Sequence, residues 1–559
     1  MKRSEPESNE TIINNFINKF KEPIPKGDDQ LQEFCYELGN SCLTFSAEMG
    51  SNLAKVLINK GIMDLIYKLL LKDEIKFMIH SELYNLIHSM YEENNLTLDK
   101  QDKLLSVVLN EFETLLEITE EMKTEIDLLQ SIVLVLIDFC NYSPDYLATI
   151  TISPTLIELI NMLKPKQEPY VIPITVSKLL VVLTEENPLC VELLTQKMPK
   201  YFDILNQMCT SKLPETLKIC YATILYNVHP IINKTVPIVF PIIQQTINKQ
   251  FVITYEELEK KREALDTADE LFIYESFNLE HNKMQIEAMK MGLELLTNIS
   301  TFDDKPNALV KQNIEESNII LNLIELLQHP INKSNQLLMT LIETVFGCLN
   351  NLFLVFNNQD VVVKQKDGKV IAIGEILYPL LLNSIKENMN ARNDTFEKSL
   401  LNCSLMCYHS LLMIEKKGIE CQYEIITDLF KTYKQKALVD CEQELQTINN
   451  LCYITSIIGK HGKISLEMIA QFVKYMMNIK LEESTEIFYD ALLNVVVDLF
   501  AEEDANPVLK KTGLFELIKK QYEPLLRYSL DHLREDDTSL EDIINNLERF
   551  IDYKKDQKM

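Results

Sequence analysis

The chain has 559 residues, of which 46% are hydrophobic and 25% charged, so it is a folded protein too long for one core, which stops growing near about 250–300 residues. Only 12 glycines and 19 prolines occur, and this scarcity of turn residues favours helices over sheets. The net charge of −28 argues against direct binding to nucleic acid or an anionic membrane. It favours a basic partner, although it is equally compatible with a role in solubility alone.

The cysteines and apolar runs indicate the compartment. Twelve cysteines are scattered through apolar stretches without a CxxC pair, which is typical of reduced, buried thiols. The first residues, MKRSEPESNETIINNF, lack the apolar segment of a signal peptide. The longest clean apolar runs, such as Ile132–Ile137, are too short to cross a bilayer. We therefore expect a soluble protein of the cytoplasm and nucleus.

The first part of the chain consists of a polar segment followed by a segment with a periodic pattern of apolar residues. Residues 1–28 are polar and contain three prolines, so we expect a mostly disordered tail with a short helix from Thr11 to Phe20. From about residue 29 onward, apolar residues recur at helical spacing. Between Leu53 and Leu70 the pattern is divided by Gly61, which predicts a helix, a glycine stop and a second helix, as in an armadillo repeat.

A repeat period runs along the chain. Many predicted helices end in an apolar–small–apolar stretch followed by polar residues. Markers in these stretches recur at steps of 45, 49, 44 and 45 residues, and, after a gap of 71, at 56, 58, 45 and 42. A period of about 40–47 is that of armadillo and HEAT repeats, which stack into a superhelix with a concave face. The sequence therefore predicts an all-α, right-handed superhelical α-solenoid, with an irregular helical bundle as the alternative. The markers are Phe45, Met90, Phe139, Leu183, Val228, Ile299, Val355, Met413, Ile458 and Phe500.

Two interruptions suggest the domain boundaries. We expect armadillo-like repeats in residues 29–250, an acidic helical connector in 251–285, HEAT-like repeats in 286–553 and a tail in 554–559. The stretch 254–304 around the connector holds 13 acidic and 5 basic residues. A small β-hairpin insertion is expected near 361–374, because Asp367-Gly368 lies between two β-branched runs.

The sequence lacks the motifs of catalysis and cofactor binding. It contains no HExxH, no GxxxxGK[ST] phosphate loop, no GxGxxG after a strand and no GxSxG. Cys403, Cys407 and His409 lie close together, but on a helix His409 points about 200° round from Cys407, and two thiols do not close a zinc site. We therefore expect no enzyme activity, no cofactor and no metal. The alternative of a different class, an enzyme with a helical fold, would need a clustered acidic motif such as DDxxD, which is not present.

A collinear set of segments from about residue 125 onward resembles the symportin family. Its members are armadillo/HEAT adaptors that chaperone newly made large-subunit ribosomal proteins. The second segment includes the turn Thr184-Glu185-Glu186-Asn187-Pro188, which resembles a characteristic TEDNP-like turn of the family. The segments are LIDFCNYSPDYLATITISPTLIELINML, VSKLLVVLTEENPLCVELL, LKICYATILYNVHPIIN, MQIEAMKMGLELLTNIS, ALLNVVVDLFAEED and NNLERFIDYKKD.

The resemblance implies a non-enzymatic adaptor that holds the two basic ribosomal proteins accompanying 5S rRNA for nuclear import and ribosome assembly. One partner would lie in the armadillo groove and the other against the acidic connector, which stands in for ribosomal RNA, and an import receptor is a further partner. We expect a monomer that binds no nucleic acid or membrane directly. The matching groove positions are Asp138, Glu185, Tyr226 and Asn227. The matching connector positions are Glu256, Glu257, Glu259, Glu263, Asp266, Asp269, Glu270 and Glu275.

The sequence departs from the family pattern in two places. The family usually begins with a basic segment carrying a proline–tyrosine import signal, whereas here only Lys2-Arg3 occur and no Pro-Tyr follows nearby. Asp138 stands where the family has an asparagine. Two alternatives of the same class stay open, an armadillo scaffold for a small GTPase or signalling partner and an import receptor for another cargo. Asn227 is also as compatible with capping a helix end as with gripping a peptide backbone.

Overall fold

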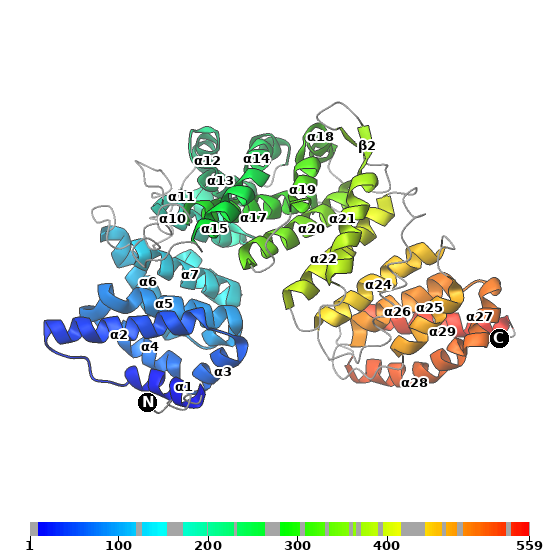
Figure 1. Ribbon diagram of the computed structural model, residues 1–559, viewed down its shortest axis with the longest axis horizontal. Coiled ribbons are helices and arrows are strands. Elements are labelled where there is room, and N and C mark those ends of the chain that lie inside the picture. Colours follow the sequence, from blue (N-terminus) through cyan, green and yellow to red (C-terminus); the bar gives the residue numbers. More distant parts are fainter. Residues whose placement is uncertain are drawn as a thin grey trace. The chain divides into compact units, whose positions relative to one another are not determined.

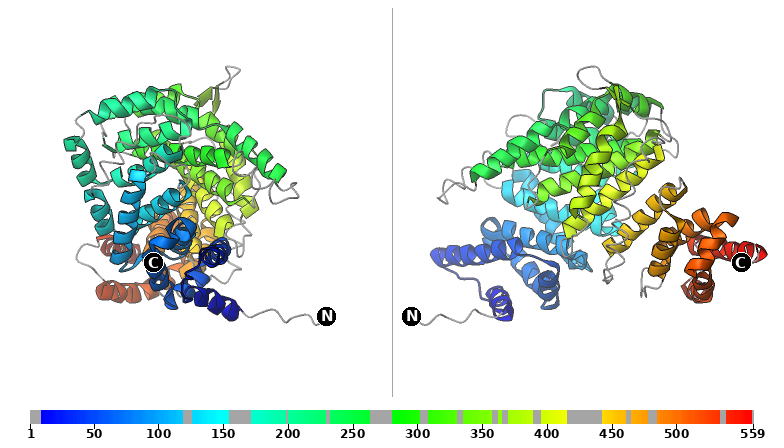
Figure 2. Two further views of the ribbon diagram at one scale, coloured as in Figure 1. Left: turned by 90° about the vertical axis from the view of Figure 1, so that its left-hand side faces the viewer. Right: turned by 45° about the vertical axis from the view of Figure 1, so that its right-hand side comes forward.

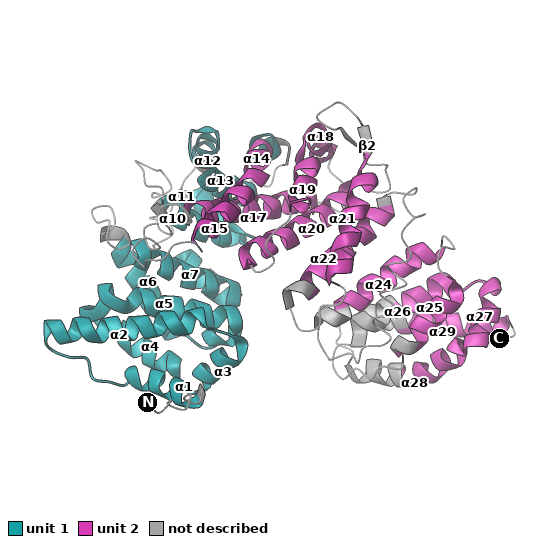
Figure 3. Cartoon of the chain, in the orientation of Figure 1, with its two compact units in different colours: residues 1–239 teal, residues 240–559 magenta. Residues whose placement is uncertain are grey.

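The structure is a computed structural model that clusters into two compact units, residues 1–239 and residues 240–559 (Figure 3). The boundary between them falls inside α14 (Ile232–Thr246). The structure describes residues 9–118, 126–153, 171–197, 200–228, 232–262, 280–301, 308–329, 335–356, 362–364, 370–388, 395–414, 442–460, 465–477, 485–532 and 538–557.

Unit 1 is formed by helices of two kinds, long helices that stack on one another and other helices that cover them (Figure 1). The long helices are α2 (Asp28–Ala47), α5 (Lys76–Glu93), α7 (Ile126–Tyr142), α10 (Val171–Thr184) and α13 (Glu215–Val228). The other helices are α1 (Asn9–Lys19), α3 (Ser51–Asn59), α4 (Ile62–Leu70), η1 (Asp73–Ile75), η2 (Asn95–Leu98), α6 (Asp102–Ile118), α8 (Pro144–Ile152), α11 (Pro188–Lys197) and α12 (Tyr201–Thr210).

The long helices of unit 1 form a continuous layer, which we call the unit 1 layer. In it α2 packs on α5, α5 on α7, α7 on α10 and α10 on α13 (Figures 1 and 2). The covering helices pack on this layer, with α4 on α5, α6 on α7 and α12 on α13. The apolar side chains meet between the two, and Tyr84, Phe112, Phe139 and Tyr221 are fully buried there. Because each repeat has apolar surface that it cannot bury alone, it is stable only when its neighbours in the stack cover that surface.

Unit 2 repeats this arrangement. Its layer helices are α17 (Glu280–Thr301), α20 (Gln336–Phe356), α22 (Thr395–Ile414), α24 (Glu442–Lys460), α26 (Thr485–Phe500) and α29 (Thr538–Asp556). Each packs on the next, and we call them the unit 2 layer (Figures 1 and 2). The other helices are α15 (Lys249–Arg262), α18 (Ala308–Glu316), α19 (Ile319–Leu327), α21 (Ile373–Asn388), α25 (Leu466–Met477), η6 (Glu503–Ala505), α27 (Asn506–Thr512) and α28 (Leu514–His532).

The repeat period of the sequence corresponds to these layers. All ten markers, from Phe45 to Phe500, lie in the C-terminal part of a layer helix, five in each unit. The periodicity therefore arises because each of these repeats contributes one layer helix. The predicted all-α solenoid class is confirmed, and the alternative of an irregular bundle is set aside.

Local signals in the sequence explain several helix ends. Gly61 separates α3 from α4 with a φ of 78°, in the left-handed region that favours glycine, which confirms the predicted glycine stop. Ser143 accepts a hydrogen bond from the backbone N–H of Asp145 and Pro144 occupies the first turn, so both set the start of α8. Residues 9–19, within the segment expected as a tail, form α1, where Phe16 stacks on the Phe45 ring with centroids 3.8 Å apart.

The predicted β-hairpin is confirmed in unit 2. β1 (Val362–Lys364) pairs antiparallel with β2 (Val370–Ala372), and Val363 lies opposite Ile371. The Asp367-Gly368 turn that predicted it lies outside the described residues. Hence the insertion adds a two-stranded ribbon between α20 and α21.

One described helix is long and apolar enough to be compared with a membrane span. It is α20, whose stretch Gln336–Phe353 meets the length and composition of such a span, with 56% of the stretch buried. Because α17 and α22 pack against it within unit 2, its apolar surface is explained by the protein core.

Candidate protein-binding surface

The C-terminal ends of the unit 1 layer helices carry the four predicted groove residues. Asn227, at the end of α13, donates a hydrogen bond from Nδ2 to the carbonyl oxygen of Val181, 3.3 Å away, and another to Oγ1 of Thr184, 3.2 Å away. Both acceptors belong to α10, the preceding layer helix. Asn227 thus donates to one carbonyl and one hydroxyl oxygen near the end of its neighbour, which corresponds to the helix-end role considered as the alternative to binding a peptide.

Asp138 links α7 to α5. It is 4% exposed, and its carboxylate lies 2.8 Å from Nδ1 of His88. The other ring nitrogen of His88 lies 3.6 Å from Glu92. Burial lowers the pKa of His88, but the hydrogen bond and charge of Asp138 outweigh burial and raise the pKa above its ordinary value. Asp138 therefore pairs with a histidine on the neighbouring helix.

Glu185 and Tyr226 differ in exposure. Glu185 is exposed in the turn after α10, and burial of part of its side chain together with the charge of Glu186 raises its pKa. The turn is fixed by Asn187, whose Oδ1 accepts from the backbone N–H of Cys190 at 3.2 Å and so caps α11. Tyr226 is only 6% exposed on α13. Of the four predicted groove residues, Glu185 is the one whose side chain is exposed to a partner, and all four stay predictions as binding residues.

The described part of the predicted connector comprises residues 251–262 in α15 and residues 280–285 at the start of α17. Glu256 is buried and lies 2.7 Å from Nε2 of His329, whereas Glu259 pairs with Arg262 at 3.2 Å. Glu257 is exposed. The other five predicted connector residues lie outside the described residues, namely Glu263, Asp266, Asp269, Glu270 and Glu275. Among the described connector residues, Glu257 is therefore the carboxylate best placed to meet a basic partner.

The unit 2 layer carries a second set of polar links, which the sequence reasoning missed. Ser410 on α22 donates to Asn350 on α20 at 2.5 Å, and Thr447 on α24 donates to Asn402 on α22 at 2.6 Å. Asp498 on α26 continues the set, since it accepts from Ser456 and lies 3.0 Å from Lys460, both on α24. In the sequence, these links could have been found from amide and hydroxyl residues that recur near the repeat period. The apolar markers do not detect this recurrence.

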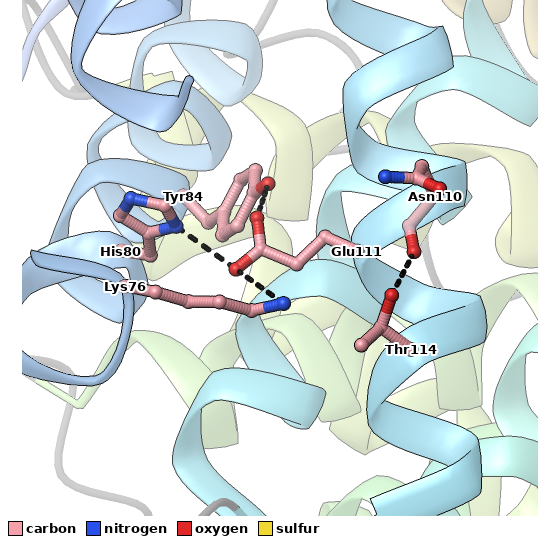
Figure 4. Close-up of polar contacts among 6 residues, drawn as sticks. All are labelled: Lys76, His80, Tyr84, Asn110, Glu111 and Thr114. Carbon is pink, nitrogen blue, oxygen red and sulfur yellow. Dashed lines mark hydrogen bonds and ion pairs between the residues drawn. The ribbon is translucent and has the colours of Figure 1, made fainter. Parts of the chain in front are cut away.

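A groove on the covering side of unit 1 was also missed. It has a volume of about 500 Å³ and lies between α4 and α6, so we call it the α4–α6 groove. Glu111 of α6 sits in its floor, with Oε1 2.9 Å from Nδ1 of His80 and Oε2 accepting from the hydroxyl of Tyr84 at 2.6 Å (Figure 4). Lys76 points toward the same carboxylate, with Nζ 3.9 Å from Oε1 (Figure 4). The sequence showed these residues only as a helical pattern, because their meeting depends on how α5 and α6 pack.

The described residues offer no metal centre. No group of three or more His, Cys, Asp or Glu side chains among them is placed to hold an ion. Cys407 is fully buried, and burial raises the pKa of its thiol well above the ordinary value, while Cys403 has a pKa raised to about 11 for the same reason. The high thiol pKa values make both cysteines poor metal ligands.

Stacked helical layers, with polar side chains along the ends of their helices, define a helical-repeat protein of the solenoid class. The family model described as "SYO1-like, TPR repeats" matches residues 305–558, which include the described helices from α18 to α29. Residues 305–558 thus match a SYO1-like repeat family, which confirms the resemblance to the symportin family. The description names TPR repeats where the sequence predicted HEAT-like ones, and both consist of paired helices.

Several solved structures align with the chain over most of its length at low identity. The structure described as the complex of SYS-1/POP-1 has 11% identity and a TM-score of 0.40, covering 96% of this chain and 91% of that chain. A structure described by the interaction between cadherin and beta-catenin has 10% identity and a TM-score of 0.40, covering 98% and 92%. An engineered protein has 10% identity and a TM-score of 0.38, covering 97% and 99%. No curated protein sequence matches the chain.

Proposed function

We propose that the chain is a non-enzymatic chaperone and adaptor for basic large-subunit ribosomal proteins, those that accompany 5S rRNA, and that it works in the cytoplasm and nucleus. The observation that carries the proposal is the SYO1-like family match over residues 305–558, within unit 2. The net charge of −28 supports it, since ribosomal proteins are basic and opposite charge speeds their capture. Carboxylates presented to such a partner would compete with RNA phosphates, so the RNA itself would drive release.

The first test identifies the partner. The full-length chain is tagged, and the proteins that bind it are captured from cells and identified by mass spectrometry. We expect the basic ribosomal proteins of the 5S particle to be enriched. Enrichment of a small GTPase or a signalling protein instead would favour the alternative scaffold role, and enrichment of a broad set of import cargoes would favour an import receptor.

The second test addresses the acidic connector. Glu257→Lys removes an exposed carboxylate of α15 without disturbing the contacts of Glu256 or Glu259. We expect it to lower the affinity for the purified ribosomal protein by about three- to tenfold at low salt, with a smaller effect at high salt. Binding is measured by fluorescence titration at several salt concentrations.

A matched control tests whether the effect depends on the position of the charge change. Glu523→Lys introduces the same charge change at an exposed position of α28 and should leave the affinity within about twofold of the original. Equal affinities for both variants and the original chain would show that Glu257 does not contact the ribosomal protein.

A further inference from the structure

The α4–α6 groove has the features of a binding site that the proposed function does not use. It opens between two covering helices of unit 1, whereas the predicted groove residues lie at the ends of the layer helices. Its volume of about 500 Å³ falls in the range of pockets that hold small ligands. The groove could therefore bind a ligand other than the ribosomal-protein partner.

The floor of the groove is a built polar network. The side chain of Glu111 is 5% exposed, and both of its oxygens are occupied by His80 and Tyr84 (Figure 4). A buried carboxylate held in this way has its charge compensated by fixed donors, and its orientation is set by two helices. Glu111 is therefore unavailable to a cationic ligand without breaking these contacts.

Lys76 has donors that the network does not use. Its side chain is 12% exposed, and Nζ lies 3.9 Å from Glu111, beyond hydrogen-bond distance. The side chain runs beside Phe77, with Nζ 5.7 Å from the ring centroid. Since burial of an ammonium group is costly unless its N–H groups find acceptors, Lys76 is poised to receive one from a ligand.

The rim supplies further donors and little negative charge. Lys103 and Asn110 of α6 and Tyr67 of α4 line the groove, and none of these side chains has a hydrogen bond or ion pair within the described part of the chain. Against these donors stands one uncommitted carboxylate, that of the exposed Asp73. The balance of open groups in the groove is thus toward donors and positive charge, in a protein whose net charge is −28.

The walls of the groove add an apolar surface from Leu70, Leu71 and Val107. We propose that the α4–α6 groove binds an organic anion, with its carboxylate or phosphate group between Lys76 and Lys103 and its carbon skeleton against these apolar side chains. The anionic group can belong to a small molecule or to an acidic side chain of another protein, since both present the same chemistry to the lysines.

The experiment uses the full-length chain with its lysines labelled by reductive ¹³C-methylation, which preserves their charge. Inorganic phosphate, citrate and a capped hexaglutamate peptide are titrated at constant ionic strength while the lysine methyl signals are followed by NMR. We expect citrate to shift the Lys76 and Lys103 signals saturably. Lys103→Ala and Lys76→Met should each weaken citrate binding by about fivefold or more. Lys103 is exposed, so its replacement tests the site without affecting folding.

Lys68→Ala is the matched control, because Lys68 is an exposed lysine of α4 that does not line the groove. It should bind citrate like the original chain. Competition between hexaglutamate and citrate would assign the site to acidic side chains, and binding of citrate or phosphate without competition would assign it to a small molecule. Absence of saturable binding for all three probes, or unchanged citrate binding by Lys103→Ala, would overturn the proposal.

Discussion

The two units stack their layer helices in the same way, but one pair of neighbouring layer helices in each unit shows that the polar link between them can differ in chemistry. In unit 1, α5 and α7 are joined by a histidine–carboxylate pair, His88 with Asp138. In unit 2, α22 and α24 are joined by a neutral hydroxyl–amide pair, Thr447 with Asn402. The first kind of link depends on protonation and the second does not. The architecture of a repeat layer therefore leaves open which polar groups tie its helices together, and this choice sets how each link responds to pH.

The largest expected effect tests whether the units behave as separate bodies. Phe139 lies in the core of unit 1 and Phe353 in that of unit 2, and both are fully buried. Phe139→Ala and Phe353→Ala should each reduce the free energy of unfolding of their own unit by about 3–5 kcal/mol. Calorimetry should show each variant lowering a different transition. A single transition shifted equally by both variants would show that the two units unfold as one.

A smaller effect should distinguish the two kinds of link. Asp138→Ala leaves His88 without its main partner and should cost unit 1 about 2–3 kcal/mol, because the lost bond involves a charged group. Thr447→Val in unit 2 removes a neutral bond and should cost about 1–2 kcal/mol. Urea unfolding followed by circular dichroism measures both. Equal losses would argue that the charge of the unit 1 link contributes nothing beyond a neutral hydrogen bond.

The smallest effect is the pH dependence of unit 1. Asp138 raises the pKa of His88 above its unfolded value of about 6.5. A raised folded-state pKa contributes stability that is fully present below the unfolded pKa and is lost as the pH rises through the folded pKa. The unit 1 transition should therefore fall in temperature as the pH rises from slightly acidic to mildly alkaline.

His88→Gln provides the control for this pH effect, because glutamine does not titrate in that range. The variant should flatten the pH dependence of unit 1 and leave the unit 2 transition unchanged. If the original chain and the variant have parallel pH profiles, His88 does not couple protonation to the stability of unit 1.

Much of the fold could be predicted because the packing of repeats produces a periodic pattern of apolar residues in the sequence. Each layer helix must bury residues against the helices before and after it, so markers such as Phe139 and Val228 recur at nearly constant steps. The break between two helices at Gly61 could be predicted because few other residues adopt its left-handed backbone conformation without strain. The hairpin could be predicted from the two β-branched runs on either side of Asp367-Gly368.

The site was harder to predict, because a polar residue in a sequence does not reveal its partner. Asp138, Asn227 and Glu256 were expected to meet a binding partner, yet each forms a hydrogen bond within its own unit. Their partners lie about one repeat or more away along the chain, so only the stacking of helices brings them together. The same reason hid the α4–α6 groove, whose floor joins His80 to Glu111 across two helices.

The sequence by itself determined the helical-repeat class, the approximate repeat period and the acidic character of the protein, because these follow from local periodicity and summed charge. The tertiary structure decided which acidic side chains pair with other residues of the chain and which, like Glu257 and Glu185, stay exposed. It also decided that Lys76 and Lys103 border one groove. Burial and pairing are properties of neighbouring repeats, and they become defined only when the helices pack.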